Sequence, residues 1–307
     1  MIIVKGRACR CLTDVKISMR GRRTLGAWGF PVFSPCAKST MNTLLPGLLA
    51  RLLVSVALAL TGHTAAYAFA TPDELAAAYL QMVRQQLHPP ADEIQYYAKR
   101  AQLMLEEGGI LLLQPQYVVV VDRDPNVQVI LVYWISSAAT PRLIGASPVS
   151  TGRVGRFDHF QTPTGIFDHS VSGGDFRAEG TKNEHGIRGY GKKGMRIYDF
   201  GWQEATRGWG QGGLSTMRLQ MHATDPDILE PRLGTVQSKG CIRIPNTLNS
   251  FLDRFGVLDV EYEAAAAAGE HMWVLSPERT PVAGAGHYLL ILDSGRTGRP
   301  SWSRPPS

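Results

Sequence analysis

The side chain in this sequence best suited to covalent chemistry is a single thiol. Cys241 is the one cysteine that follows residue 70, and it lies in the run Ser238-Lys239-Gly240-Cys241-Ile242-Arg243. A thiolate is a strong nucleophile, and a nearby histidine or cation lowers the thiol pKa. Lys239 and Arg243 flank the cysteine within two positions, and His222 precedes it by nineteen. The pattern predicts an activated cysteine, although a buried structural cysteine with two solvated basic neighbours fits the spacing equally well.

Two neighbours of the thiol add to the catalytic interpretation. Gly240 permits a sharp backbone turn, and the consecutive N–H groups of Gly240 and Cys241 are the kind that form an oxyanion hole for acyl transfer. Arg243 has the planar guanidinium that binds a carboxylate by two parallel hydrogen bonds. We therefore expect an acyl-transfer site that recognises a carboxylate.

The surrounding elements are predicted from hydrophobic periodicity and turn residues. Residues 71–107 read as a helical hairpin, residues 114–277 as a mainly β catalytic domain, and residues 278–307 as a partly disordered tail rich in Arg, Ser, Gly and Pro. The glycine-rich stretch 172–213 lacks periodicity and is interpreted as functional loops. Strands are expected at 116–121, 127–135, 143–149, 218–221 and 272–275, and a short helix at 247–255.

Three short motifs together resemble a known family. LQMHAT at 219–224, SKGCIR at 238–243 and TPTGIF at 162–167 are similar to motifs of the YkuD-type L,D-transpeptidase catalytic domain. Residues 195–200 faintly resemble the wall of that family's substrate cleft. The resemblance covers roughly residues 116–275, and it implies a β-sandwich or barrel preceded here by the short helical hairpin.

The resemblance also implies a reaction on peptidoglycan. Cys241 would attack the tetrapeptide stem at the bond between diaminopimelate and the terminal D-alanine, and D-alanine would leave. The resulting thioester would pass to an amine, giving a cross-link or an anchored product. His222 would be the general base, the carbonyl of Ala223 would orient its ring, and Gly240 would belong to the oxyanion hole. Substrate contacts are expected from Ser238, Lys239, Arg243 and Tyr198, with no cofactor or metal.

One departure from the family pattern leaves alternatives open. Lys239 stands where the family most often has histidine, and a protonated lysine has no acceptor. It could help to lower the thiol pKa, or it could mark an L,D-carboxypeptidase that resolves the thioester with water. A catalytically idle envelope-binding scaffold is a third possibility. The acceptor is equally open between another stem peptide, an envelope protein and a free D-amino acid.

The N-terminal residues predict that the protein is exported from the cytoplasm. Residues 41–70 have the layout of a signal peptide, with Arg51, a short apolar run and small residues, and the run is too short for a stable membrane span. Residues 1–40 are interpreted as a gene-start artefact, with translation beginning at Met41. Residues 1–70 hold nine of the 32 basic residues and one of the 26 acidic ones, so the remainder has 23 basic and 25 acidic residues, a net charge of −2. This balance argues against nucleic acid as a partner and favours a periplasmic, cell-wall function.

Three histidines could suggest a zinc site. His159, His169 and His185 lie in a polar, glycine-rich span with several aspartates. They lack the helical i, i+4 spacing and the CxxC pairs that are typical of zinc ligands. We therefore expect no metal, and interpret His185 as a loop hydrogen-bonding residue.

Overall fold

The computed structural model describes residues 71–137 and 139–304. The expected gene-start segment 1–40 and signal peptide 41–70 lie outside these residues. Within the described ranges, no helix combines the length and apolar character needed to cross a membrane. The fold is mainly β, as the sequence predicts, and it consists of two mixed sheets and a few helices.

The first sheet, sheet A, has five strands in the order β3-β2-β1-β9-β4. β1 is antiparallel to β2 and parallel to β9, which joins this sheet near the C-terminal end of the chain. The run of valines in β1 is buried on both faces, which is the pattern of a central strand. The strands are β1 (Gln116–Asp122), β2 (Val129–Ser136), β3 (Ala139–Pro148), β4 (Gly165–Asp168) and β9 (Tyr288–Leu292).

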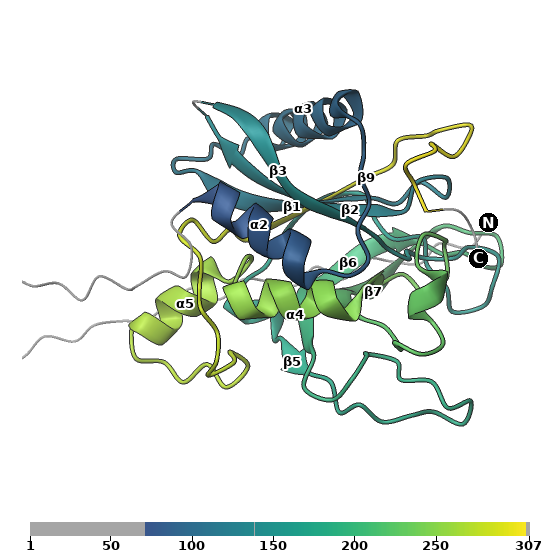
Figure 1. Ribbon diagram of the computed structural model, residues 1–307. Helices are drawn as coiled ribbons and strands as arrows, with labels where there is room; N and C mark the ends of the chain where they lie inside the picture. Colours follow the sequence, from purple (N-terminus) through teal and green to yellow (C-terminus); the bar gives the residue numbers. More distant parts are fainter. Residues whose placement is uncertain (1–70, 138, 305–307) are drawn as a thin grey trace, which may run out of the picture. The chain divides into compact units, whose positions relative to one another are not determined.

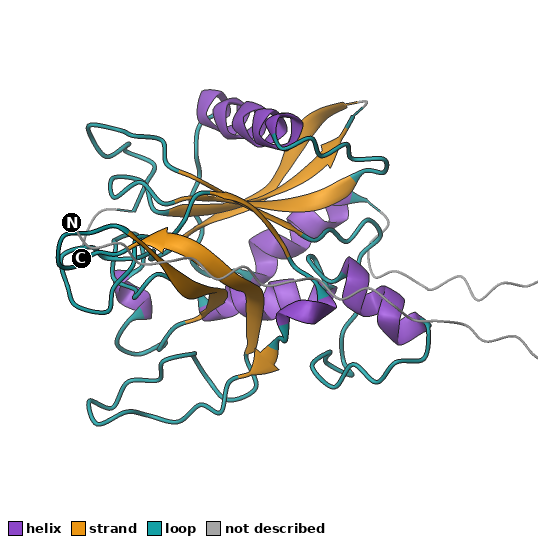
Figure 2. Cartoon of the chain, turned by 180° about the vertical axis from the view of Figure 1, so that it is seen from behind, coloured by secondary structure: helices purple, strands orange, loops and turns teal. Residues whose placement is uncertain are grey.

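The second sheet, sheet B, contains β5 (Phe176–Arg177), β6 (Arg196–Thr206), β7 (Leu214–Ala223) and β8 (Ile242–Ile244), in that order. Figure 2 shows the two sheets from behind. Tyr198, Met221 and Ile242 from sheet B join Val119 from sheet A in one buried cluster. Because side chains alternate along a strand, the residues between these core positions project from the other face of sheet B.

Helices α2 (Pro72–Met82) and α3 (Ala91–Glu107) confirm the two predicted helices but do not form the expected hairpin. Tyr79 of α2 lies in the cluster between the sheets, whereas Tyr97 of α3 packs with Val118 in a separate cluster. The two helices therefore cover opposite faces of sheet A, α3 on the outer face (Figure 1). Alternation along β1 makes this possible, because Val118 and Val119 point to different sides.

Two further helices follow sheet B. α4 (Asn246–Phe255) confirms the helix predicted at 247–255, and α5 (Val260–Ala267) follows it. Asn249 fixes α4 to β6, since its side chain accepts from the N–H of Arg196 at 3.2 Å and donates to the carbonyl of the same residue at 2.8 Å. Short 3-10 turns lie at Val171–Gly173 and Glu230–Arg232.

The C-terminal part departs most from the sequence-based expectation. The predicted strand at 272–275 is a turn, and the strand that completes sheet A is β9, beyond the predicted domain boundary at 277. The segment after β9 is also structured: Trp302 packs edge-on against Tyr97, and Ser303 donates to the carbonyl of Val127 at 2.7 Å. Its polar composition suggested disorder, but its contacts with α3 and with the turn between β1 and β2 place it in the domain up to residue 304.

Candidate active site

The parallel pair β7–β8 brings the predicted histidine and cysteine to one side of sheet B. His222 lies opposite Arg243 in the register, and Met221 lies opposite Ile242. Met221 and Ile242 point into the core. By alternation, His222, Cys241 and Arg243 share the face of the sheet that points away from the core. His222 and Arg243 are therefore neighbours across the two strands, and Cys241, which directly precedes β8, lies on the same side and close to Arg243.

His222 has a defined ring orientation. Its Nδ1 lies 2.7 Å from the carbonyl oxygen of Ala223, so Nδ1 carries the proton and Nε2 is left as the acceptor. The side chain is almost completely buried, and this burial, with a smaller contribution from Arg243, lowers its pKa from 6.5 to about 4. The imidazole is thus neutral at pH 7, which is the form that can accept a proton.

The thiol of Cys241 does not have the depressed pKa that the flanking cations suggested. Its sulfur lies 3.9 Å from the carbonyl oxygen of Arg218. Burial raises the thiol pKa, and the nearby charge of Asp199 raises it further, against the opposing effects of the Gln220 backbone N–H and Arg243. The unliganded site therefore pairs a neutral thiol with a neutral imidazole, and the prediction of an already activated thiolate is wrong.

The turn before the cysteine is held by Ser238. This side chain is buried, accepts from the N–H of Gly240 at 3.0 Å, and donates to the carbonyl of Cys241 at 2.5 Å. Its hydroxyl is occupied within the loop, so the predicted substrate contact is replaced by a structural role. The Gly240 N–H is engaged by the same hydroxyl, so this structure does not present it as an oxyanion donor. Gly240 has φ +131, and an added Cβ would lie 2.7 Å from the sulfur of Met217.

Lys239 points away from the thiol. Its ammonium pairs with the carboxylate of Asp158 at 2.7 Å, and both side chains are more than half exposed. The charges that act on the thiol come from Arg243 and Asp199. The suggestion that Lys239 lowers the thiol pKa is therefore not supported.

Arg243 is the cation that faces the site. Its Nε is buried and has no hydrogen-bond partner among the described residues. Burial lowers its pKa, and the thiolate form of Cys241 would raise it, which shows that the two side chains are close. A buried donor without a partner is costly, so this guanidinium is well placed to receive an anionic group from a ligand.

The prediction that Tyr198 contacts the substrate is wrong. It is completely buried between the sheets, in the cluster that contains Met221, so it is not exposed to a substrate. Tyr190 takes that place: its ring packs edge-on against His222 with 4.6 Å between centroids, and 40% of the residue is exposed. Its position in a glycine-rich loop was the only signal in the sequence, since Gly189 and Gly191 flank it.

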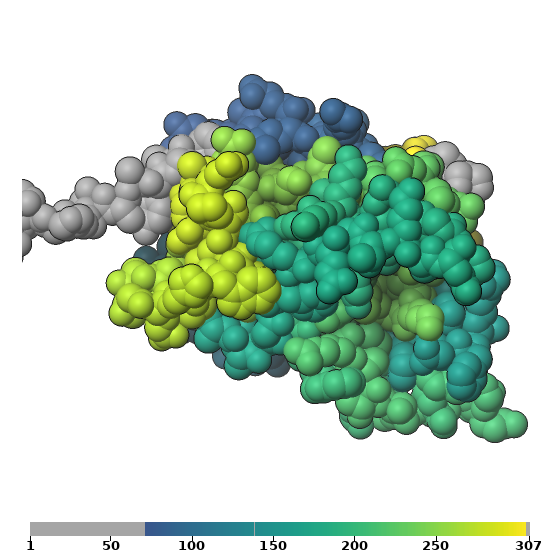
Figure 3. Space-filling model, turned by 90° about the horizontal axis from the view of Figure 1, so that it is seen from below, coloured from purple at the N-terminus to yellow at the C-terminus, as the bar shows by residue number. Residues whose placement is uncertain are grey.

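Gly191 explains how Tyr190 approaches the histidine. It has φ +83, and an added Cβ would lie 2.7 Å from the Cβ of Ala223. Only glycine allows the loop to pass so close to the strand that carries His222. Figure 3 shows the segment around residues 170–195 lying across this side of the molecule. A cavity of about 430 Å³, lined in part by Tyr190, Phe176 and Glu179, adjoins the site.

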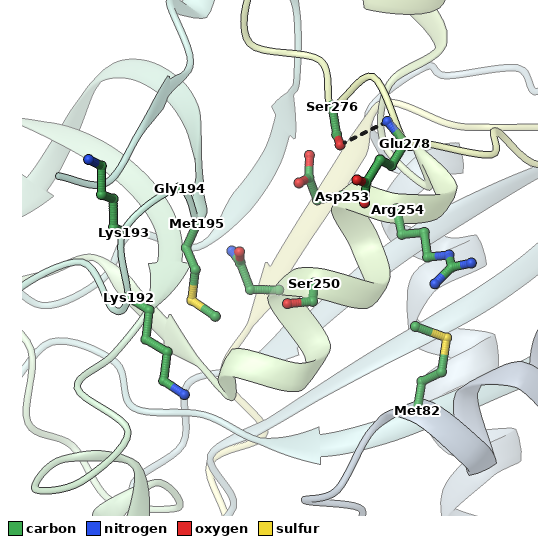
Figure 4. Close-up of a pocket in the computed structure, with 11 residues that line it drawn as sticks. Met82, Lys192, Lys193, Gly194, Met195, Ser250, Asp253, Arg254, Ser276 and Glu278 are labelled. Atoms are coloured by element: carbon green, nitrogen blue, oxygen red, sulfur yellow. Dashed lines mark hydrogen bonds between the residues drawn. The ribbon is translucent and has the colours of Figure 1, made fainter. Parts of the chain in front are cut away.

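A second cavity lies beyond the same loop. It measures about 470 Å³ and is lined by Lys192 and Lys193, by Ser250 and Arg254 of α4, and by Glu278, among others. In Figure 4 the side chains of Lys193 and Arg254 point away from each other, so they do not converge on one ligand position. This cavity contains neither Cys241 nor His222, and we assign it no part in the chemistry.

The three histidines considered for zinc are separated in the structure. His169 is fully buried, with its Nε2 2.9 Å from Asp175, whereas His185 is exposed and His159 bonds the carbonyl of Phe157. Among the described residues, no group of three or more His, Cys, Asp or Glu side chains is placed to hold a metal ion. Asp175 also accepts from Arg196 at 2.7 Å, so His169 belongs to a buried ionic cluster.

Comparison of the sequence with models of known protein families and with curated proteins gave no match.

Proposed function

We propose that this protein is a cysteine acyltransferase, and specifically an exported L,D-transpeptidase that acts on peptidoglycan stem peptides. The observation that carries the proposal is the set of side chains on one face of β7–β8. A neutral His222, fixed through Nδ1 to the Ala223 carbonyl, shares this face with Cys241 and with Arg243, whose buried Nε lacks a hydrogen-bond partner among the described residues. The motifs LQMHAT and SKGCIR support the same assignment.

The protonation states define the order of the chemical steps. Because both groups are neutral at rest, Nε2 of His222 accepts the thiol proton as the sulfur of Cys241 attacks the carbonyl carbon. The tetrahedral intermediate collapses when the imidazolium returns that proton to the leaving amine, which departs as D-alanine. His222 is then neutral again and removes a proton from the acceptor amine, which attacks the thioester and regenerates the thiol. No nucleotide is required, because one acyl bond replaces another.

Arg243 supplies specificity in this proposal. A tetrapeptide stem carries carboxylates close to the bond that is broken, and the buried guanidinium can bind one of them by charge-assisted hydrogen bonds. Peptidoglycan stem peptides are accordingly the proposed partners, with an acceptor peptide or envelope protein as the second substrate. Because this substrate lies outside the cytoplasmic membrane, the proposed location is the periplasm.

A hydrolase on the same site differs only in the acceptor. Water in place of the amine would release a tripeptide, making the enzyme an L,D-carboxypeptidase. Lys239, the residue that raised this alternative, is paired with Asp158 on the surface. Its position therefore supplies no argument for hydrolysis.

The proposal is tested by incubating the purified protein with disaccharide-tetrapeptide and a D-amino acid, and identifying the products by mass spectrometry. We expect an exchange product or a cross-linked dimer that is lost in Cys241→Ala. Tripeptide alone would move the assignment to the carboxypeptidase. Unchanged tetrapeptide would overturn the proposal in favour of the idle scaffold, an outcome with which the raised thiol pKa would also agree.

A further inference from the structure

A buried carboxylate lies two strands away from the candidate nucleophile in sheet B. Asp199 of β6 is fully buried and lies opposite Gln220 of β7 in the strand register. Its Oδ2 accepts from Arg218 Nε and from Gln220 Nε2, both at 2.7 Å, and its Oδ1 accepts from the N–H of Gly201 at 2.8 Å. One carboxylate therefore holds two side chains of the strand that carries His222.

The same two residues contact the sulfur through their main chains. The carbonyl of Arg218 lies 3.9 Å from the Cys241 sulfur, and the backbone N–H of Gln220 is near enough to lower the thiol pKa. Asp199 holds the side chains of Arg218 and Gln220 by hydrogen bonds. The peptide groups of the same two residues lie against the sulfur of Cys241 and fix its position. The position of the thiol thus depends on a carboxylate that does not bond to it.

Asp199 is also connected to His222, through Gln220 and Tyr190. Because the amide nitrogen of Gln220 donates to Asp199, its Oε1 points the other way and accepts from the hydroxyl of Tyr190 at 3.3 Å. The ring of Tyr190 packs against His222. One buried group is therefore connected to both members of the proposed catalytic pair, by peptide contacts to Cys241 and by a hydrogen-bonded chain to the ring beside His222.

The electrostatic effect of Asp199 is unfavourable for a nucleophile. Its negative charge raises the pKa of Cys241, as it also does for Tyr190. Arg218 pairs with Asp199, and Arg243 lowers the thiol pKa by more than Asp199 raises it, so the raised thiol pKa comes mainly from burial. Activation of the thiol therefore cannot be what this carboxylate contributes.

We propose that Asp199 is a positioning residue of the reaction, which holds Cys241 and His222 in register through Arg218, Gln220 and Tyr190. This inference rests on the proposed function, because it takes Cys241 as the nucleophile. Removing the charge while keeping the shape must then have two opposite effects. The thiol becomes easier to ionise, yet it reacts more slowly with a substrate that requires the aligned pair.

The test uses Asp199→Asn in the full chain, with Glu204→Gln as the matched control. Glu204 is an exposed carboxylate on the same strand. Two rates are measured for each protein: alkylation of Cys241 by iodoacetamide as a function of pH, and acylation of Cys241 by disaccharide-tetrapeptide, followed by mass spectrometry. For Asp199→Asn we expect the alkylation midpoint to move to lower pH while acylation falls at least ten-fold. The control should match the wild type in both.

A double variant separates positioning from general loss of structure. In Asp199→Asn with Gln220→Glu, the introduced amide can donate to the introduced carboxylate, which can still accept from Tyr190. This polarity-reversed bond should restore at least part of the acylation rate, whereas a merely destabilised domain would not recover. Acylation of Asp199→Asn at the control rate, or parallel loss of both reactions without rescue, would overturn the positioning role. A wild type that alkylates but is never acylated would instead overturn the proposed function itself.

Discussion

Burial of His222 makes the free energy of unfolding depend on pH. One substitution at this position can separate its contribution from those of the other titratable groups. The folded-state pKa is about 4, whereas an unperturbed histidine titrates near 6.5. As the pH falls below 6.5, the unfolded chain gains a proton at this position that the folded chain does not accept until about pH 4. Stability from this group is therefore complete above pH 6.5 and is lost as the pH falls towards 4.

The size of this change in unfolding free energy follows from the difference between the folded and unfolded pKa values of His222. A difference of about 2.5 pKa units at ~1.4 kcal/mol per unit corresponds to about 3 kcal/mol, which is reached near pH 4. His222→Gln removes the titration and keeps a polar side chain of similar length. Comparing the wild type with the variant cancels the contributions of the other acidic and basic groups, including the buried His169.

The assay is urea unfolding of both proteins at pH 7 and pH 4. Between these two values, the wild type should lose about 3 kcal/mol more unfolding free energy than His222→Gln, by the linkage relation above. Equal losses in the two proteins would show that His222 titrates normally. The imidazole of His222 would then not be held neutral by its burial, and it could not be the resting base in the way proposed.

Further predictions concern the site and its support. Alkylation of Cys241 in the unliganded protein should reach half its maximal rate only above pH 9.0, because burial raises the thiol pKa; a midpoint near pH 6 would contradict the resting thiol. Arg243→Gln should reduce kcat/KM for the stem peptide by about 10- to 150-fold, the range for ~1.5–3 kcal/mol in a lost charged hydrogen bond, and an unchanged value would exclude its carboxylate contact. Gly191→Ala should lower both Tm and activity, because the new Cβ would lie 2.7 Å from that of Ala223; a variant with wild-type Tm would show that the loop is free to move. Arg196→Met should cost roughly 3–5 kcal/mol in urea unfolding, since Asp175 and its buried neighbours lose their cation, and a loss below 1 kcal/mol would show that the cluster relaxes.

The predictable part of the fold was the part with local periodicity. The apolar runs of β1 and β2 and the amphipathic pattern of α4 are properties of short windows, so their positions agree closely with the structure. Strand β9 was missed because its apolar run follows a segment rich in Gly and Pro, and its partner β1 lies far away in the sequence. The two N-terminal helices were found, but whether they pack on each other or on opposite faces of a sheet is a tertiary property.

The candidate site likewise contains residues that could be predicted from the sequence and residues that could not. His222 and Cys241 were recognisable by residue type and spacing, and the register of β7 with β8 places His222 beside Arg243, two residues after Cys241. Tyr198 and Tyr190 could not be distinguished by type, because the period-2 pattern of β6 was hidden among glycines and charged residues. Asp199 reads as an ordinary polar residue in sequence. Its importance comes from its register opposite Gln220, which depends on the pairing of two strands.

The most direct test of the central claim is the mass of the acylated enzyme. The purified protein is mixed with disaccharide-tetrapeptide, quenched in acid within the first turnover, and analysed intact and after digestion. We predict an adduct equal to the donor minus D-alanine, located on the peptide that contains Cys241 and absent from Cys241→Ala. Formation of product with no adduct at Cys241, or an adduct on another residue, would contradict it.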